Sequence, residues 1–203
     1  MRRAALPVIA AVMLVGCAAA PRVVPVHGAQ VDPVQVTDWT ARGRLAIAIG
    51  SEGGSGSFTW LQQAGTTDLQ VRGPLGAGSM RIVTDGEAVT VTDADGLIVD
   101  TDAARRQIRA RLGTDLPFAE MRFWLLGVAA PGSEARVRAP GAGPSLVIEQ
   151  AGWTVSYDPF TTARGWSVPT RLTAASGAAR IKVVLDEWRL PAPREVDPGT
   201  PAP

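Results

Sequence analysis

The side chains that could carry covalent or acid–base chemistry in this chain are few. Its 203 residues include one cysteine, Cys17, and one histidine, His27, both near the N-terminus. A thiol is a nucleophile and a site of covalent modification, and an imidazole is the usual general base near neutral pH. Cys17 directly follows Gly16 and closes a short apolar run that begins after Arg3. This placement favours modification of Cys17 over catalysis.

The segment from Arg2 to Cys17 resembles a bacterial lipoprotein signal peptide, with Leu14-Val15-Gly16-Cys17 as its lipobox. Its charged start stays in the cytoplasm, and an apolar run of about a dozen residues is too short to span a bilayer. The resemblance implies that residues 1–16 are removed and that Cys17 is acylated as the mature N-terminus. Two or more acyl chains anchor a protein stably. The alternative is an ordinary signal peptide with an incidental cysteine.

Residue types around the cysteine and in the mature chain narrow the possible locations and partners. Ala18, rather than an aspartate, follows Cys17, which favours the outer membrane and its periplasmic face. Loss of residues 1–16 lowers the number of basic side chains from 20 to 18, against 19 acidic ones. This balance argues against nucleic acid as a partner, because phosphate binding needs a basic face. The remaining length suffices for one domain with a core.

No arrangement of residues for catalysis or metal binding is apparent. His27 lies in a Pro-rich segment where no rigid neighbour would orient it as a base or ligand. The patterns HExxH, GxSxG, CxxC and GxxxxGK[ST] do not occur. Glu120 and Glu149 could in principle act as an acid–base pair, but solvated helix and strand positions explain them more simply. We therefore expect a non-enzymatic protein without a metal or cofactor.

Composition divides the chain into four parts. After the signal peptide, residues 17–37 are rich in Ala, Val and Pro and are expected to form a flexible tether. About 20 residues at roughly 3.1 Å each would reach about 60 Å. Residues 38–190 are expected to form the folded domain. Residues 191–203 are rich in proline and nearly devoid of apolar residues, so a disordered tail is predicted.

Within the domain, apolar and polar residues alternate along about ten short runs, a pattern that predicts antiparallel strands with one apolar face. We therefore expect these strands to form a curved sheet or a partial barrel. Asp85-Gly86 and Asp95-Gly96 predict hairpin turns. The glycine-rich segment 50–56 is not followed by a helix signal. A flexible hairpin loop is therefore expected there rather than a phosphate site.

Two helices are predicted to interrupt the strands and to lie over the concave side of the sheet as a lid. The first has Asp102 as a candidate N-cap and Gly113 as a candidate C-cap. The second starts at Pro117 and ends at Gly127. Residues 128–144 show no period and are expected to form a long loop.

Tryptophans and one leucine could serve either structure or binding. Trp60, Trp124 and Trp153 lie in predicted elements, where they would either fill the core or line an apolar cavity. Leu75 lies in the loop 73–78 among Gly, Pro and Ala, so it has few neighbours to bury it and is expected to project outward. On a membrane-anchored protein, such a leucine could enter the lipid interface.

Several short motifs follow one another along the mature domain, among them Gly56-Ser57-Phe58-Thr59-Trp60, Gly73-Pro74-Leu75-Gly76, Trp124-Leu125-Leu126-Gly127 and Gln150-Ala151-Gly152-Trp153. Their order and spacing resemble the LolB family of outer-membrane lipoprotein receptors over nearly the whole mature domain. The resemblance implies a mainly β fold with an α lid: an unclosed antiparallel β-barrel of about eleven strands, with short helices covering an apolar cavity.

The resemblance also implies a function and its residues. The protein would accept acylated lipoproteins from a periplasmic carrier of the LolA type and insert them into outer-membrane lipid, acting as a monomer. Leu75 corresponds to the family's membrane-insertion leucine. We further hypothesise that Phe58, Trp60, Trp124 and Trp153 line the acyl-chain cavity. The alternatives are a structural or assembly lipoprotein without a lipid cavity, and a LolA-like periplasmic carrier.

Overall fold

A computed structural model describes residues 33–74, 78–99, 101–112, 116–141 and 143–192. Cys17, His27, Leu75 and Gly113 lie outside these residues. Eleven strands form one antiparallel sheet in the order β6-β5-β4-β3-β2-β1-β13-β12-β9-β8-β7. The strands of this sheet are β1 (Trp39–Ile49), β2 (Glu52–Gln63), β3 (Thr66–Arg72), β4 (Ser79–Thr84), β5 (Val89–Thr92), β6 (Ile98–Val99), β7 (Ala135–Arg138), β8 (Leu146–Gln150), β9 (Trp153–Tyr157), β12 (Arg171–Ser176) and β13 (Ala179–Arg189).

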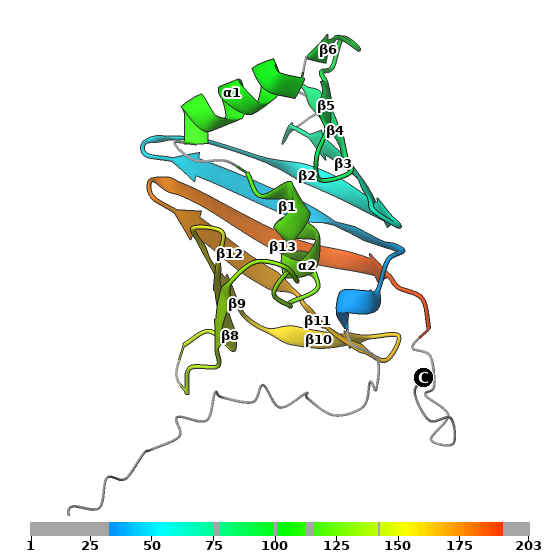
Figure 1. Cartoon of the computed structure of the whole chain (residues 1–203), viewed down its shortest axis with the longest axis vertical. Helices are drawn as coiled ribbons and strands as arrows, with labels where there is room; N and C mark the ends of the chain where they lie inside the picture. Colours follow the sequence, from blue (N-terminus) through cyan, green and yellow to red (C-terminus); the bar gives the residue numbers. More distant parts are fainter. Residues whose placement is uncertain (1–32, 75–77, 100, 113–115, 142, 193–203) are drawn as a thin grey trace, which may run out of the picture.

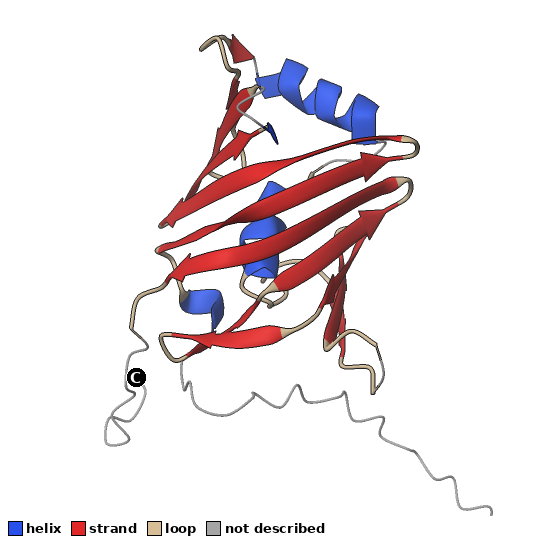
Figure 2. Cartoon of the chain, turned by 180° about the vertical axis from the view of Figure 1, so that it is seen from behind, coloured by secondary structure: helices blue, strands red, loops and turns tan. Residues whose placement is uncertain are grey.

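The sheet curves around one side but does not close. Its end strands, β6 and β7, are not paired with each other, and the outer strands fold toward the same side as α2 (Figure 1). Seen from behind, the long strands β1, β2 and β13 present the convex side, and α2 lies beyond them (Figure 2). The expected unclosed barrel of about eleven antiparallel strands is confirmed.

The two ends of the domain meet in the centre of this sheet. β1 pairs with β13 along its length, with Leu45 opposite Val183 and Ile47 opposite Ile181. Successive side chains along most of β13 alternate between buried and more exposed positions, as the sequence pattern predicts. The apolar side chains gather on the concave face and form one continuous core cluster. The core therefore depends on residues from the start and the end of the domain together.

A glycine allows the closest approach in this central pair. The register of β1 and β13 shifts between Arg42 and Gly43, which is the mark of a β-bulge. A Cβ atom on Gly43 would lie 1.9 Å from the carbonyl oxygen of Val184. Only glycine fits at this position.

Two helices follow β6. The first, α1 (Thr101–Leu112), has Asp102 in its first turn and contacts β5. The second, α2 (Phe118–Leu125), starts after Pro117 and packs its buried residues into the core cluster. Gly127 has a φ of 79° after the helix, as a helix-terminating glycine requires. Neither described helix is long and apolar enough to cross a membrane.

Two sequence predictions need correction. The segment 50–56 is not a loop: β2 begins at Glu52, and its glycines pair along β1. The segment 128–144 contains β7, a short edge strand whose four residues carry too weak a pattern to be recognised. Two further strands, β10 (Phe160–Ala163) and β11 (Trp166–Pro169), form a separate two-stranded ribbon. A 3₁₀ turn, Pro33–Gln35, precedes β1.

Candidate functional site

An apolar cleft lies between α2 and the concave face of the sheet. Its lining comes from the helix and the residues before it, and from three strands: Leu116, Pro117, Met121, Trp124, Leu125, Trp153, Leu172, Ala174, Ile181 and Val183. None of these side chains is ionisable. The lining thus has no group for proton transfer, and what it can do is shelter hydrocarbon.

The enclosed part of this cleft is small. Its volume is about 30 Å³, or about 360 Å³ when the space at its open mouth is included. The enclosed part has room for roughly two water molecules. A long alkyl chain therefore fits only if the covering helix or its neighbours are displaced.

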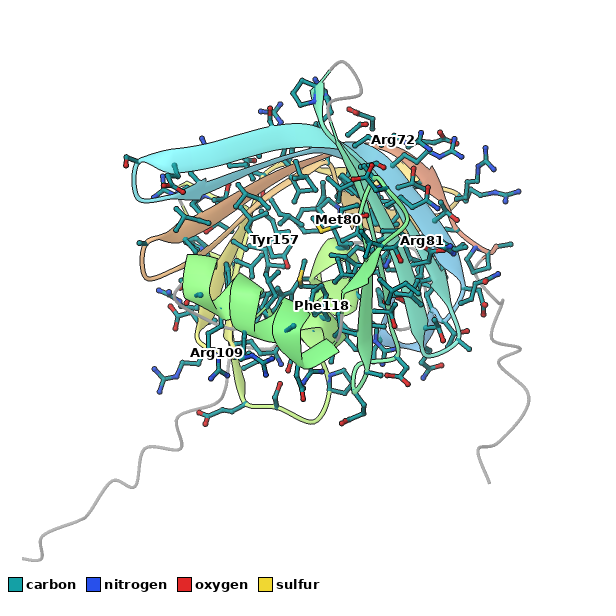
Figure 3. The ribbon with its side chains drawn as sticks, turned by 90° about the horizontal axis from the view of Figure 1, so that it is seen from above. Arg72, Met80, Arg81, Arg109, Phe118 and Tyr157 are labelled. Carbon is teal, nitrogen blue, oxygen red and sulfur yellow. The ribbon has the colours of Figure 1, made fainter. Side chains whose placement is uncertain are left out.

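A larger space adjoins the cleft between α1 and α2. Its volume is about 430 Å³, and Leu116 and Pro117 line both spaces. Arginines of α1 and Phe118 of α2 also contribute to its lining. Phe118, Met80 and Tyr157 point toward the middle of the molecule (Figure 3). Met80 is 42% exposed, and its flexible thioether leaves an adaptable apolar surface on the inner side of β4.

A buried amide holds α2 against the sheet. The Gln150 Oε1 atom accepts hydrogen bonds from the Trp124 indole N–H at 3.0 Å and from the Ala130 backbone N–H at 2.9 Å. Its Nε2 atom donates to the Ala130 carbonyl at 2.8 Å and to the Ser133 hydroxyl at 2.7 Å. Because each of these buried groups has a partner, the closed position of α2 leaves none of them unsatisfied.

A second buried amide stabilises the core at another place. The Gln62 Oε1 atom accepts from the Trp60 indole N–H at 3.3 Å and from the Thr67 hydroxyl at 2.7 Å. Trp60 stacks on Trp39 with ring centroids 6.0 Å apart, and Trp39 contacts Trp188 at 5.6 Å. This cluster joins β1, β2 and β13.

The four tryptophan and phenylalanine side chains proposed as cavity lining occupy two different environments. Trp124 and Trp153 line the cleft. Trp60 and Phe58 are buried in the same core cluster but are not among the residues that line it. Phe58 packs beside Gly43, where its ring fills the space of the missing side chain. Strand alternation places Phe58, Trp60 and Trp153 on the concave face, and Trp124 is a buried residue of α2. Only the position of α2 separates cleft from core.

The loop that carries Leu75 is described only at its base. The Gly73 backbone N–H donates to the Gly78 carbonyl at 3.0 Å, which closes the hairpin between β3 and β4. Pro74 is exposed. Leu75 itself lies outside the described residues.

The carboxylates considered for catalysis do not share a site. Glu120 lines the space between the helices, whereas Glu149 lines a separate hollow near β7 and β8 and forms an ion pair with Arg138. In the described part of the chain, no three His, Cys, Asp or Glu side chains are grouped to hold a metal ion.

Several cleft residues were not singled out by sequence reasoning. Met121 and Leu125 share the helical spacing of Trp124, and Leu172, Ile181 and Val183 follow strand alternation, so both patterns were visible. The patterns did not show that this face of α2 packs against β12 and β13. Gln150 was noticed only as part of a motif, and nothing local indicated that it would bind Trp124.

Comparison with known proteins gives consistent matches. The family described as "Outer membrane lipoprotein LolB" matches residues 37–188. The outer-membrane lipoprotein LolB of Alkalilimnicola ehrlichii is 34% identical over 155 residues, 76% of this chain and 78% of that protein. The protein of the same name from Halorhodospira halophila is 30% identical over 155 residues, 76% of each chain. A LolA superfamily protein from Nitrosomonas europaea has a TM-score of 0.46 at 10% identity, covering 77% of this chain and 87% of that one.

Proposed function

The chain belongs to the LolB family of outer-membrane lipoproteins, which is not a family of enzymes, and on that premise we propose that it accepts acylated lipoproteins from a LolA-type periplasmic carrier and inserts them into the outer membrane. The observation that carries this proposal is the cleft under α2, whose lining is apolar throughout. Hydrocarbon is the one class of ligand that such a lining favours over water.

The size of the hydrophobic penalty explains why such a protein is needed. A triacylated cysteine carries about three chains, roughly 45 methylenes, and exposing them to water costs on the order of 30–40 kcal/mol. Free diffusion of a lipoprotein through an aqueous compartment is therefore negligible. Direct transfer between two apolar cavities avoids this exposure.

The closed cleft must open for an acyl chain to bind. We place the movement in α2 and the residues before it, since they form one complete side of the cleft. The N-terminus of α2 has no side-chain capping bond, and its first turn is held by the burial of Phe118 in the core cluster. Met121 can repack around a chain, because its side chain is unbranched and flexible.

The direction of transfer is proposed to follow affinity. The sequence contains no nucleotide-binding loop of the GxxxxGK[ST] type, so no energy source is assigned to the protein. The acyl chains would pass to this cavity because it binds them more tightly than the carrier does, and then to the bilayer because it is the most favourable environment of the three.

The remaining parts of the chain would serve attachment and delivery. Acylated Cys17 would anchor the protein to the periplasmic face of the outer membrane, with residues 17–37 as a tether and 191–203 as a flexible tail. Leu75 would enter the membrane when the lipoprotein is released. Trp124 and Trp153 would contact the acyl chain, and Phe58 and Trp60 would shape the wall behind them.

Binding of a fluorescent fatty acid tests the cleft. Ala174 lines the cleft, and Ala174→Leu adds three carbon atoms to a space with room for about two waters. We expect at least tenfold weaker binding, whereas Ala46→Leu, the same change at an exposed position of β1, leaves binding unchanged. If the wild-type protein binds no fatty acid, the alternative of a structural lipoprotein without a lipid cavity is correct.

Replacement of the loop leucine tests the membrane step separately. The variant Leu75→Glu is assayed for acceptance of a lipoprotein from the carrier and for its release into liposomes. We expect normal acceptance and a loss of release, since a carboxylate does not enter the hydrocarbon region. Normal release by this variant would remove Leu75 from the mechanism. Efficient delivery by a Cys17→Ser variant would favour the LolA-like carrier instead.

A further inference from the structure

Four arginines surround the base of the loop 73–78 on the convex face of the sheet. They are Arg42 and Arg44 of β1, Arg72 of β3 and Arg81 of β4, called here the arginine patch. The strand register places them in two rows: Arg44, Ser57 and Arg72 are neighbours across three strands, and Arg42, Thr59, Gln70 and Arg81 across four. Arg72 and Arg81 lie at the outer surface of the molecule (Figure 3).

The patch encloses a polar hollow. Its volume is about 280 Å³. Its lining includes three of the arginines, two carboxylates that pair with two of them, and the hydroxyl and amide groups between: Arg42, Gly43, Arg44, Ser57, Phe58, Thr59, Gln70, Arg72, Asp186 and Glu187. Guanidinium, hydroxyl and amide groups are the donors that bind phosphate oxygens. This hollow is on the opposite face of the sheet from the apolar cleft.

Three of the four arginines already have carboxylate partners. Arg44 binds Asp186 through two hydrogen bonds of 3.0 and 3.1 Å, Arg81 binds Asp68 at 2.6 and 3.0 Å, and Arg42 lies 3.5 Å from Glu187. Within the described residues, Arg72 has no hydrogen-bond or ion-pair partner. The fixed pairs hold the neighbouring guanidinium groups in place, and Arg72 supplies the uncompensated charge.

Chain length limits how far Arg72 can lie from Leu75. Arg72 is the last residue of β3, and the bond between Gly73 and Gly78 closes the loop directly after it. Leu75 is three residues after Arg72, so the chain between them spans at most about 10 Å. The headgroup layer of one leaflet is about 5–7 Å thick. With Leu75 at the hydrocarbon boundary, Arg72 would therefore be within reach of the lipid phosphates.

From this geometry we propose that the hollow framed by the arginine patch binds the phosphate of an anionic phospholipid in the target membrane, with Arg72 as the principal contact. This inference rests on the proposed function, because it specifies how the loop side of the protein meets the bilayer. Arg72 would form hydrogen bonds with the phosphate oxygens, and Ser57 and Gln70 would donate to the same headgroup. The contact would orient the domain before the leucine enters.

The test uses the full lipidated protein reconstituted in vesicles. Ser79 lies opposite Arg72 on β4, so a Ser79→Cys substitution carries a fluorophore whose quenching by headgroup-labelled lipid reports docking. Vesicles contain phosphatidylcholine alone or with about one third phosphatidylglycerol. One arginine near an anionic surface is worth about 1 kcal/mol, so Arg72→Gln is expected to lower the docked-to-undocked ratio about fivefold on anionic vesicles, and not on neutral ones.

Arg136→Gln is the matched control, since Arg136 is an exposed residue of β7 at the other end of the strand order. It should leave docking unchanged. An unchanged docking ratio for Arg72→Gln, or an equal loss for Arg136→Gln, would overturn the proposal. The proposal would also be overturned if Arg72→Gln docked normally on vesicles but accepted lipoprotein from the carrier less well. That result would show that the arginine patch contacts a protein. Fatty-acid binding by the same samples reports on the cleft independently, so failure of the proposed function is recognised separately.

Discussion

The variant Gln150→Leu separates the stability of the closed cleft from its capacity to bind an acyl chain. The substitution leaves three buried groups without partners: the Trp124 indole N–H and the backbone N–H and C=O of Ala130. Each unsatisfied group costs about 1 kcal/mol or more, and burial of the leucine returns about 1–2 kcal/mol. Ser133 is exposed, so water can replace its bonds. We expect the free energy of unfolding to fall by about 2 kcal/mol.

The same change should strengthen binding of a fatty acid. The bond from Trp124 joins α2 to Gln150, so its loss raises the population of the open form, and apparent affinity follows that population. A bias of about 2 kcal/mol corresponds to at most about 30-fold tighter binding. Urea denaturation measures the first effect, and titration with a fluorescent fatty acid measures the second. Gln150→Leu is therefore expected to lower the free energy of unfolding and to raise the affinity for a fatty acid.

Gln62→Leu is the control for this experiment. Gln62 holds Trp60 and Thr67 by a similar set of bonds, but it does not line the cleft. We expect a comparable loss of stability with no change in fatty-acid affinity. If Gln150→Leu weakens acyl binding together with stability, or leaves it unchanged, α2 is not the element that opens.

Three further predictions concern single side chains. The Tyr157 hydroxyl is buried and has no hydrogen-bond partner among the described residues, and burial raises its pKa, so Tyr157→Phe should raise the free energy of unfolding by about 1 kcal/mol in urea titrations. Backbone N–H groups of Ala88 and Glu87 lower the pKa of Asp85 in the folded protein. Ionised Asp85 therefore stabilises the fold above its unfolded-state pKa, and this stabilisation is lost as the pH falls through the lower folded-state pKa. The difference in Tm between wild type and Asp85→Ala should vanish in acid. Gly43→Ala should cost about 3 kcal/mol by chemical denaturation.

The main features of the fold followed from local pattern. Alternating apolar residues predicted the strands, and the turn at Asp85 was recognised because its side chain accepts the backbone hydrogen bonds that such a turn leaves open. The second helix was recognised from Pro117 and Gly127 at its ends. The glycines of β2 were predicted to form a loop, because glycine has a low strand propensity. In the structure they are strand residues, because they pair with β1.

What the sequence determined by itself is which side chains share a face, because periodicity is a local property of the backbone. It therefore placed Phe58, Trp60, Trp124 and Trp153 on the inner side without distinguishing their surroundings. Only the tertiary structure decided that α2 covers β9, β12 and β13, so that two of these aromatic residues line a cleft and two pack in the core. The same holds for the arginine patch, since its four members become neighbours only through the register of separate strands.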